Sequence, residues 1–287
     1  MQYNNIHVDE RYSPILEPNL YGDNIFTPGV TFNQAFAAGN PGAGLVRVYR
    51  QNPEPLVKPG APAQKFTHAD AANSLLDIRL NNAFRVSRAI YQVQANSIAY
   101  ALADQTLSEA VAGVKQGWTV SGLACLISEG TSLPGTAPVT AANIKTTILD
   151  ARRAARKAKS SPSVVLASVD AFSAMLEAAG SEFTPGINDS MMLSGQVGNW
   201  LGMTWFECNA TEESEASYFD HAGDPQTADL SKVEFVMYDP AAFSIINNLE
   251  LMRVVDSENF AGSLAQVEFN TGYRVTGPAR VTVKKRA

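Results

Sequence analysis

The clearest helical pattern in the chain lies between residues 93 and 118. Apolar side chains recur there at intervals of three and four, which places them along one face of a helix: Tyr100, Ala103, Leu107, Val111, Val114 and Trp118. The pattern fades at Gly117. At about 1.5 Å per residue, such a helix would be nearly 40 Å long. The sequence therefore predicts one long helix, followed over 119–139 by a strand or short helix and a Gly/Pro-rich loop.

Strand-like patterns flank a proline-rich stretch upstream of this helix. Apolar and polar residues alternate over 44–50, and a second such stretch at 75–80 runs on towards 84–90. The four prolines between 53 and 62 exclude a helix or a central strand there. We expect residues 45–90 to form a hairpin that projects from a body. The alternative is a surface loop of an enzyme.

Residues 1–44 show neither period, yet they contain many large apolar side chains. Their Asn, Gly and Pro content is typical of a disordered tail. A solvated tail would expose large apolar residues to water, at a cost in free energy; the segment includes Tyr12, Leu16, Tyr21, Phe26 and Phe32. We therefore expect an extended arm that lies on another surface. Thirty extended residues reach on the order of 100 Å, beyond the body of one subunit.

From residue 140 the pattern becomes that of an α/β layer. Thr140 is expected to cap a helix over 141–159, with these residues facing inward: Ile144, Ile148, Ala151, Ala155 and Ala158. A buried strand follows at 164–169. Asp170 is then expected to cap a short helix with its own inward residues: Phe172, Met175, Leu176 and Ala179.

The remaining third of the chain is predicted to be mainly β structure. Glycines punctuate a turn into a strand over 195–208, and the polar, acidic residues 210–232 are interpreted as a surface loop. A strand at 233–238 leads to Asp239-Pro240, which is typical of a helix start. The closing strands are expected at 249–255, 263–269, 273–275 and 280–284.

Composition and charge narrow the function classes. Charged residues make up 17% of the 287 residues, below the usual quarter, which indicates a surface partly covered by neighbouring copies. A net charge of −6 argues against nucleic-acid binding by the chain as a whole. The N-terminus lacks a signal-peptide pattern, and no apolar run reaches the roughly 18 residues of a membrane span. We therefore expect cytosolic synthesis and no membrane association.

The predicted helix at 141–159 carries a basic outer face. It is formed by Lys145, Arg152, Arg153, Arg156, Lys157 and Lys159. Cations near the carboxyl end of a helix are favoured by its dipole. Three interpretations remain open: a solvated face, contact with an acidic neighbouring copy, or contact with nucleic acid.

Patterns of catalytic chemistry are missing from the sequence. It has no phosphate-binding loop, His-Glu-x-x-His, Cys-x-x-Cys or Gly-x-Ser-x-Gly motif. Cys125 and Cys208 lie far apart in apolar stretches, which is typical of buried free thiols. The three histidines are widely separated. We expect no catalytic residue, no cofactor and no metal site.

The order of these segments resembles the major capsid protein of tailed bacteriophages, the HK97-like fold. The resemblance rests on three stretches: the helix from Ala141 leading to Ser163-Val-Val-Leu-Ala-Ser-Val-Asp-Ala-Phe; Gly195-Gln-Val-Gly-Asn-Trp-Leu-Gly-Met-Thr-Trp-Phe-Glu-Cys-Asn209; and Phe269-Asn-Thr-Gly-Tyr-Arg-Val. Upstream, the arm, hairpin and long helix follow the family's order. Each motif is short and degenerate, but together they cover almost the whole chain.

The resemblance implies an α+β fold with five parts. These are an N-terminal arm (1–44), an extended E-loop hairpin (45–90), a peripheral domain with a spine helix (91–139), an axial α/β domain (140–250) and strands that return to the peripheral domain (251–287). It also implies a structural protein and not an enzyme. Copies would form hexamers and pentamers of an icosahedral shell that encloses double-stranded DNA without sequence-specific binding.

The resemblance further implies partners, location and contacts. Scaffolding and portal proteins would assist assembly, a decoration protein is an optional partner, and the protein would occupy the virion after assembly in the host cytoplasm. Subunit contacts are expected in the arm and hairpin, at Tyr12, Leu16, Tyr21, Phe26, Phe32, Arg47, Arg50, Lys58 and Lys65. The Lys–Asn cross-link of some family members is not carried over, because no partner Asn can be assigned.

Three other functions remain open at this point. An encapsulin-like nanocompartment shell would share the fold and hold enzyme cargo. A cytosolic α/β enzyme would use residues 163–246 as its catalytic layer. A tail or adhesin component would form tubes or fibres.

Overall fold

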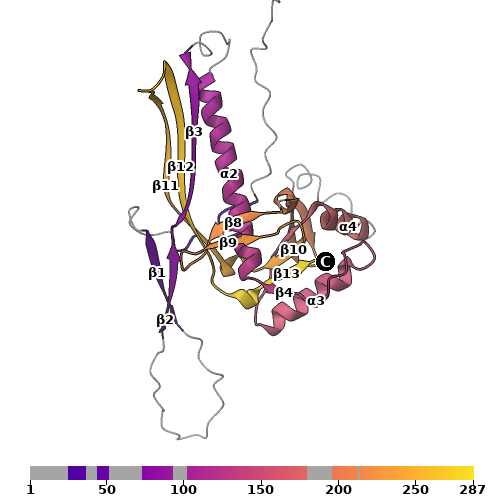
Figure 1. Ribbon diagram of the computed structural model, residues 1–287. Coiled ribbons are helices and arrows are strands. Elements are labelled where there is room, and N and C mark those ends of the chain that lie inside the picture. Colours follow the sequence, from indigo (N-terminus) through magenta and orange to yellow (C-terminus); the bar gives the residue numbers. More distant parts are fainter. Residues whose placement is uncertain (1–24, 37–43, 52–72, 93–101, 180–195, 213) are drawn as a thin grey trace, which may run out of the picture.

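The computed structural model describes residues 25–36, 44–51, 73–92, 102–179, 196–212 and 214–287. Helix α2 (Leu102–Glu129) and a three-stranded sheet form an elongated part, which joins a more compact part built on a six-stranded sheet (Figure 1). Strands β1 (Leu45–Gln51) and β2 (Asn73–Arg79) form a separate hairpin that extends from the junction. The mixed architecture confirms the α+β class.

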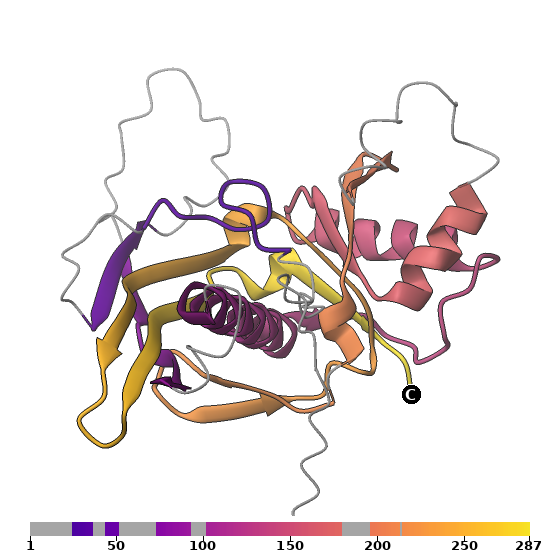
Figure 2. The ribbon, with the colours of Figure 1, turned by 90° about the horizontal axis from the view of Figure 1, so that it is seen from above.

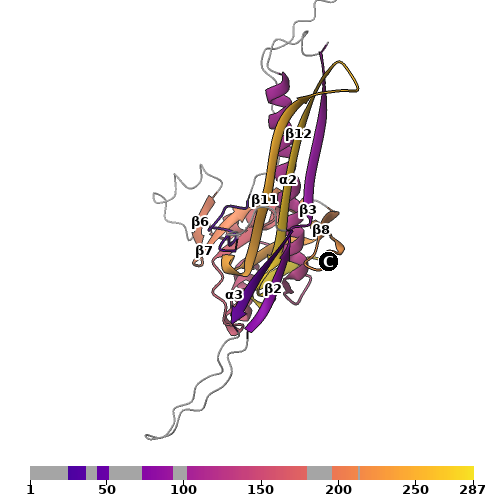
Figure 3. The same cartoon turned by 90° about the vertical axis from the view of Figure 1, so that its left-hand side faces the viewer.

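The elongated part is a one-sided antiparallel sheet covered by α2 (Figure 3). Its strands are β11 (Phe243–Asp256), β12 (Gly262–Val275) and β3 (Asn82–Tyr91), in that order. Alternate residues face α2, so Val267 and its partner Val86 pack with the helix. The other face is polar: Arg85 pairs with Glu268 at 2.9 Å. This alternation is typical of a sheet with one covered and one solvated face.

Helix α2 is placed further along the chain than the sequence pattern predicted. Instead of ending near Gly117, it continues to Glu129, whereas the start of the predicted helix at 93–101 lies outside the described residues. Residues 121–127 are buried on every side, so the last turns have no polar stripe to reveal the period. Gly117 lies against the ring of Phe84, within the helix. With 28 residues, the helix is about 42 Å long.

The compact part is a six-stranded sheet with helices on both faces. Its strand order is β4 (Thr131–Ser132), β13 (Val281–Lys285), β10 (Val233–Tyr238), β5 (Val164–Ala167), β7 (Met203–Glu207) and β6 (Gln196–Trp200). Helices α3 (Ile144–Lys157) and α4 (Val169–Ala179) lie on the face of the sheet opposite to α2. Figure 2 shows α2 nearly end-on, with α3 and α4 on the other side of the sheet. Alternate residues of β5 therefore enter two cores: Val165 faces α3 and α4, and Val164 faces α2.

The last strand, β13, differs from the expected organisation. It lies between β4 and β10 in the six-stranded sheet and does not return to the three-stranded one. Its apolar residues Val281 and Val283 join the same core as α2 and β10. Of the closing strands, β11 and β12 alone build the elongated sheet.

The two helices of the compact part are confirmed, with corrections at their ends and faces. Most of the inward residues predicted for α3 and α4 are buried, but Ala158 and Leu176 are exposed. Ser168, and not Asp170, caps α4, since its Oγ accepts the Ala171 N–H at 3.3 Å. Helix α3 begins at Ile144, after three turn residues, so Thr140 is not its cap.

The polar stretch 210–232 is not only a loop. After the short helix η1 (Asn209–Glu212), it forms a hairpin of β8 (Ala216–Phe219) and β9 (Pro225–Ala228) that packs on α2. Ala216 and Tyr218 point inward, and the Ser121 hydroxyl donates to the Ser217 carbonyl at 2.7 Å. Only two residues of β8 are buried, which is too short an alternation to stand out in an acidic segment.

Two short helices complete the described fold. In η2 (Pro240–Ala242), the Asp239 carboxylate accepts the Ala241 N–H at 3.1 Å, which confirms the predicted helix start. The other, η3 (Pro278–Arg280), precedes β13.

The cysteines and the apolar character of α2 are explained by burial. Cys125 and Cys208 are free and buried, as predicted. From Asp104 to Glu129, α2 is long and apolar enough to cross a membrane by length and composition. Most of that stretch is buried inside the protein's own core, as in the central helix of a globular domain.

Candidate assembly interface

The β1–β2 hairpin has an inner and an outer face. In the antiparallel register, Val46 opposes the fully buried Ile78, which anchors the inner face. On the outer face Tyr49 opposes Leu75, and these side chains are 80% and 58% exposed. Directly opposed side chains form one contact surface. The outer face thus presents an apolar pair that is largely exposed among the described residues.

Only two of the four contact residues predicted for the hairpin, Arg47 and Arg50, are among the described residues. Arg47 lies on the outer face and pairs with Asp77, directly opposite it, at 3.4 Å. Arg50 opposes Ser74 in the strand register. Lys58 and Lys65 lie outside the described residues. Tyr49 and Leu75 were not among the predicted contacts, although the alternation that predicted the strand places Tyr49 on the same face as Arg47.

Residues 25–36 correct one part of the interface prediction. Phe26 and Phe32 are 2% and 1% exposed and lie inside the chain's own core, so little of either ring is available to a neighbouring subunit in this conformation. Trp118 of α2 meets both rings edge-on, with centroids 5.7 and 6.1 Å away. Gly122 allows this packing, because a Cβ there would lie 2.8 Å from the Phe26 ring.

Hydrogen bonds hold the same segment to the six-stranded sheet and β11. The buried Tyr238 hydroxyl donates to the Thr31 carbonyl at 2.8 Å. The Asn33 N–H donates to the Phe243 carbonyl at 2.8 Å. The sequence identified apolar groups that need cover but could not reveal which body covers them. Tyr12, Leu16 and Tyr21 lie outside the described residues, and their contacts remain a prediction.

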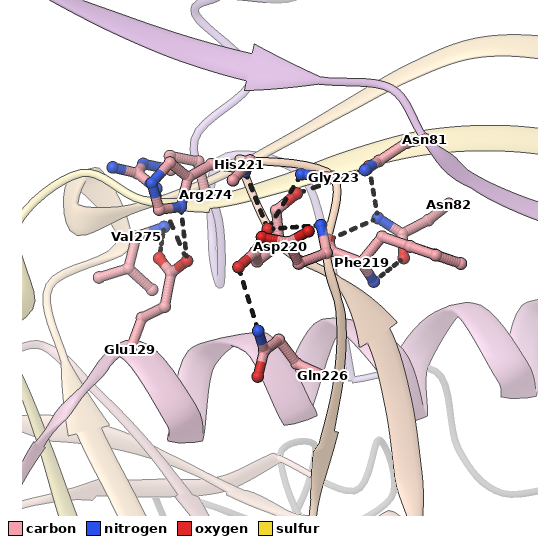
Figure 4. A network of polar contacts seen from close by, with 12 residues as sticks. Asn81, Asn82, Glu129, Phe219, Asp220, His221, Gly223, Gln226, Arg274 and Val275 are labelled. Atoms are coloured by element: carbon pink, nitrogen blue, oxygen red, sulfur yellow. Dashed lines mark hydrogen bonds and ion pairs between the residues drawn. The ribbon is translucent and has the colours of Figure 1, made fainter.

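A polar joint fixes the base of the hairpin where β2 passes into β3 (Figure 4). The Asn82 side chain bonds both backbone groups of Phe219: its Oδ1 accepts the N–H at 2.8 Å, and its Nδ2 donates to the carbonyl at 3.2 Å. Asn81 Nδ2 donates to the Asp220 carbonyl at 3.3 Å. The β8–β9 turn is therefore clamped to the point where the chain leaves the hairpin. The sequence pattern predicted one strand running from 75 towards 90, whereas the structure has a break between β2 and β3 at Leu80 and Asn81.

The turn itself is held by the Asp220 carboxylate. Burial alone would raise the pKa of Asp220, but hydrogen bonds from the backbone N–H groups of Asp224, Ala222 and Gly223 and from the Gln226 amide outweigh it, so the pKa lies below its usual value. The carboxylate thus stays ionised at neutral pH and keeps its acceptors available to the turn.

At the carboxyl end of α2, Glu129 ties the helix to β12 and to the same turn. Its Oε2 accepts the Val275 N–H at 3.1 Å, and its Oε1 lies 3.7 Å from both Arg274 and His221 (Figure 4). Helix, sheet, turn and hairpin base therefore meet at one point. Such a joint can set the direction in which the hairpin leaves the body.

Replacing Gly272 tests that joint. A Cβ at Gly272 would lie 2.5 Å from the Arg79 carbonyl at the end of β2, so Gly272→Ala must push the hairpin base away from β12. We expect a loss of about 1–3 kcal/mol in the free energy of unfolding, the usual cost of overpacking. Gly44→Ala is the matched control, because a Cβ there meets nothing within 4 Å. Urea titration of both variants is the measurement, and equal stability would contradict the close approach.

The basic face of α3 is partly engaged within the chain. Arg152 donates to the Leu201 carbonyl at 3.0 Å, Arg153 pairs with Asp150 at 2.7 Å, and Arg156 donates to the Ser161 hydroxyl at 2.8 Å. Lys157 and Lys159 are exposed. These internal bonds account for the three arginines without a partner molecule.

Several titratable groups among the described residues are buried in the core. In the described part of the chain, no group of three or more His, Cys, Asp or Glu is placed to hold a metal ion. Burial, followed by the nearby Glu129 charge, raises the pKa of the Cys125 thiol well above its usual value. Because the thiolate is the nucleophile, a buried thiol with a raised pKa is inert. Burial likewise raises the pKa of the Tyr238 and Tyr273 hydroxyls.

Comparisons with known proteins identify the fold. No protein-family model matches the chain, and a search of curated proteins finds no relative. Among solved structures, a chain from Mycobacterium phage Che8 matches 99% of this chain and 98% of its own length, at 17% identity and a TM-score of 0.70. The capsid of the Cyanophage P-SCSP1u matches 97% and 92%, at 10% identity and a TM-score of 0.68. The mature capsid of bacteriophage PhiM1 matches 97% and 93%, at 14% identity and a TM-score of 0.57.

These matches extend over nearly the full length of both partners. They confirm, at the level of the fold, the resemblance to phage capsid proteins stated from the sequence. The described segment 25–36, the β1–β2 hairpin, α2 and the six-stranded sheet all fall within the matched region.

Proposed function

We propose that this chain is a major capsid protein whose copies assemble into a closed icosahedral shell around the double-stranded DNA genome of a tailed phage. The observation that carries the proposal is the near-complete match in fold, in both directions, to chains of phage capsids, and the step from that fold to a shell function is an analogy. Hexamers and pentamers would be the building units, since closed shells are built by symmetric repetition of one contact set.

The outer face of the hairpin supports assembly through neighbouring copies. Tyr49 and Leu75 stand opposite one another on a ribbon that leaves the body, and both are largely exposed. Exposed apolar groups on a projecting element are typical of a contact surface. We therefore assign this face, together with Arg47, to the contact with an adjacent subunit. Arg50 falls on the opposite face of the hairpin by the strand register, so its proposed contact, like those of Lys58 and Lys65, is separate from this outer face.

The proposed division of the chain into domains follows the fold. Residues 1–44 remain the proposed arm, and the proposed E-loop is the part of 45–90 that precedes β3, because β3 pairs with β12 in the three-stranded sheet. Residues 91–139, together with β3, β11 and β12, form the proposed peripheral domain, and the rest of 140–250 with β13 forms the proposed axial domain. Many modest contacts per subunit add through multivalency, so a shell can be stable although each contact is weak.

The proposed role is structural and not enzymatic. The Cys125 thiol and the Tyr238 hydroxyl are buried in the core with raised pKa values, which supports a packing role for both side chains. Scaffolding and portal proteins are the proposed assembly partners, a decoration protein is an optional one, and the virion is the proposed location, after assembly in the host cytoplasm.

Sedimentation and negative-stain electron microscopy of the purified chain test this function. We expect closed, icosahedral particles far larger than the 30.8 kDa subunit, either spontaneously or when a scaffolding protein is co-expressed. The particles should be empty or filled with DNA. Particles filled with an enzyme cargo would indicate a nanocompartment instead, and tubes or a monomer with catalytic turnover would reject the proposal.

A further inference from the structure

A strap of exposed residues carries the chain from α2 and β4 to α3. We call residues 133–140 the strap; within it, residues 134–138 are all exposed. Leu133 and Val139 are its inward side chains, and they pack between the six-stranded sheet and the helices α3 and α4. Segments with little buried apolar surface open more easily than the sheets and helices around them. The strap therefore needs other contacts to stay in place.

Two buried charged side chains fasten the strap to the sheet. The Glu234 carboxylate of β10 accepts the Val139 N–H through Oε2 at 2.6 Å. The Lys284 ammonium of β13 donates to the Gly135 carbonyl, also at 2.6 Å. Glu234 and Lys284 are 5% and 4% exposed, and among the described residues they are the only charged side chains that are buried. Charged side chains are rarely buried without a partner, and here both partners are backbone groups of the strap.

A bulge in β10 directs the Glu234 side chain towards the strap. The register between β10 and β13 shifts between Val233 and Phe235, at Glu234. Phe235 lies in the core on the α3 side of the sheet, so alternation alone would point its neighbour Glu234 to the other side. Instead, Glu234 bonds Val139, which belongs to that same core. Bulges commonly re-aim a side chain in this way.

The negative charge of Glu234 is poorly compensated. The carboxylate makes no ion pair with a described residue. Burial raises the pKa of Glu234 above its usual value, and the charge of Asp170 on α4 adds to the rise. The Val139 N–H and the charges of Arg286 and Lys284 oppose the rise without cancelling it. With the strap in place, the carboxylate therefore binds a proton more tightly than a solvated glutamate does.

We propose that the strap opens while the sheet beneath it stays folded, and that a proton on Glu234 favours the closed strap. Opening lets water reach the carboxylate and so removes the cost of burying its charge. A protonated carboxyl group has no such cost, and its carbonyl oxygen still accepts the Val139 N–H. The stabilisation of the closed strap is complete below the ordinary pKa of a glutamate. It is lost as the pH rises through the raised pKa of the closed form.

The ends of the strap are held by local bonds that can act as hinges. The Leu133 N–H donates to the Val283 carbonyl at 2.7 Å, beside the two-residue pairing of β4 with β13. At the other end, Asn143 Oδ1 accepts the Thr140 N–H at 2.8 Å. Release of the middle lengthens the link between α2 and α3 while β10 and β13 remain paired. The helix layer of the compact part can then shift relative to α2.

Hydrogen–deuterium exchange of the full-length, unassembled chain tests the inference. Mass spectrometry gives protection factors, corrected for the intrinsic rate at each pH, for the strap and for β10, which reports unfolding of the sheet. At pH 7 we expect the strap to be at least about tenfold less protected than β10. From pH 5 to pH 8, its protection relative to β10 should fall about threefold or more. Lys284→Met, which removes the other fastener, should lower the protection of the strap at every pH.

Two glutamine variants separate Glu234 from other carboxylates. Glu234→Gln keeps an acceptor oxygen and cannot ionise, so the protection of its strap should not depend on pH. Glu177→Gln makes the same exchange at an exposed position of α4 and should keep the pH dependence of the parent. A pH dependence that survives Glu234→Gln would overturn the inference. So would a strap as well protected as β10, or a parent profile that is flat or rises with pH, and these two outcomes need no variant that folds. No shell is involved, so the proposed function is tested separately.

Discussion

A Tyr49→Asp, Leu75→Asp double variant should fold normally and form no shells. The two side chains are opposed on the outer face of the hairpin and largely exposed, so charged replacements cost the isolated subunit little. In a shell, both carboxylates would be pressed against a neighbour, and burying an unpaired charge costs several kcal/mol. Because each 1.4 kcal/mol changes an association constant about tenfold, the loss should exceed what higher protein concentration can restore.

Thermal unfolding and negative-stain imaging measure the two halves of this prediction. The matched control is Tyr49→Phe with Leu75→Met, which keeps the face apolar and should still assemble. An aspartate variant that forms normal particles at the parent's concentration would remove this face from the interface. Because like charges directly opposed on paired strands destabilise a hairpin, Tyr49→Asp with Leu75→Lys is tested as well, and unfolding of both variants would show that the face is covered by its own chain.

The second large effect concerns stability and not assembly. Phe26→Ala should lower the free energy of unfolding by about 3–5 kcal/mol, the usual cost of truncating a buried phenylalanine. Phe26 packs against Trp118, Phe32 and Phe243 and is 2% exposed, so its removal leaves a cavity in the main core. Urea denaturation of the unassembled subunit is the measurement.

Val30→Ala is the control within the same segment. Val30 is 39% exposed, and its truncation should cost no more than about 0.5 kcal/mol. If the two substitutions cost the same, residues 25–36 are not seated in their own core. Phe26 would then return to the set of residues available to a neighbour.

Local periodicity in the sequence predicted most elements of the compact part. Strands β5 and β10 are short, apolar and β-branched, and α3 shows a regular stripe that ends in Ala155, so burial of these elements could be read directly. The last turns of α2 could not be predicted from periodicity, because a helix that is buried on all sides has no polar face. The same reason hides the extent of many central helices.

The candidate interface was harder to predict, because it depends on contacts distant in sequence. The composition of residues 1–44 indicated that apolar groups needed cover, but only the fold shows that Phe26 and Phe32 are covered by α2 and β11 of the same chain. Likewise, the break at Asn81 and Asn82 is set by bonds to Phe219 and Asp220, more than 130 positions away. No local pattern carries that information.

The outer face of the hairpin was predicted in part from local periodicity and in part could not be predicted. Alternation over 44–50 correctly predicted a strand and its two faces. Which face turned away from the body became clear only from the burial of Ile78 opposite Val46. The sequence predicted Arg47 as a contact residue of this face. The structure shows that the larger exposed apolar area belongs to Tyr49 and Leu75.

A high-resolution reconstruction of the assembled protein is the most direct test of the account. We expect a closed shell in which Tyr49 and Leu75 of each hairpin are buried against an adjacent subunit. Phe26 and Phe32 should remain in the core of their own subunit. Particles in which the outer face of every hairpin is open to solvent would contradict it. So would a protein that remains a monomer under all assembly conditions.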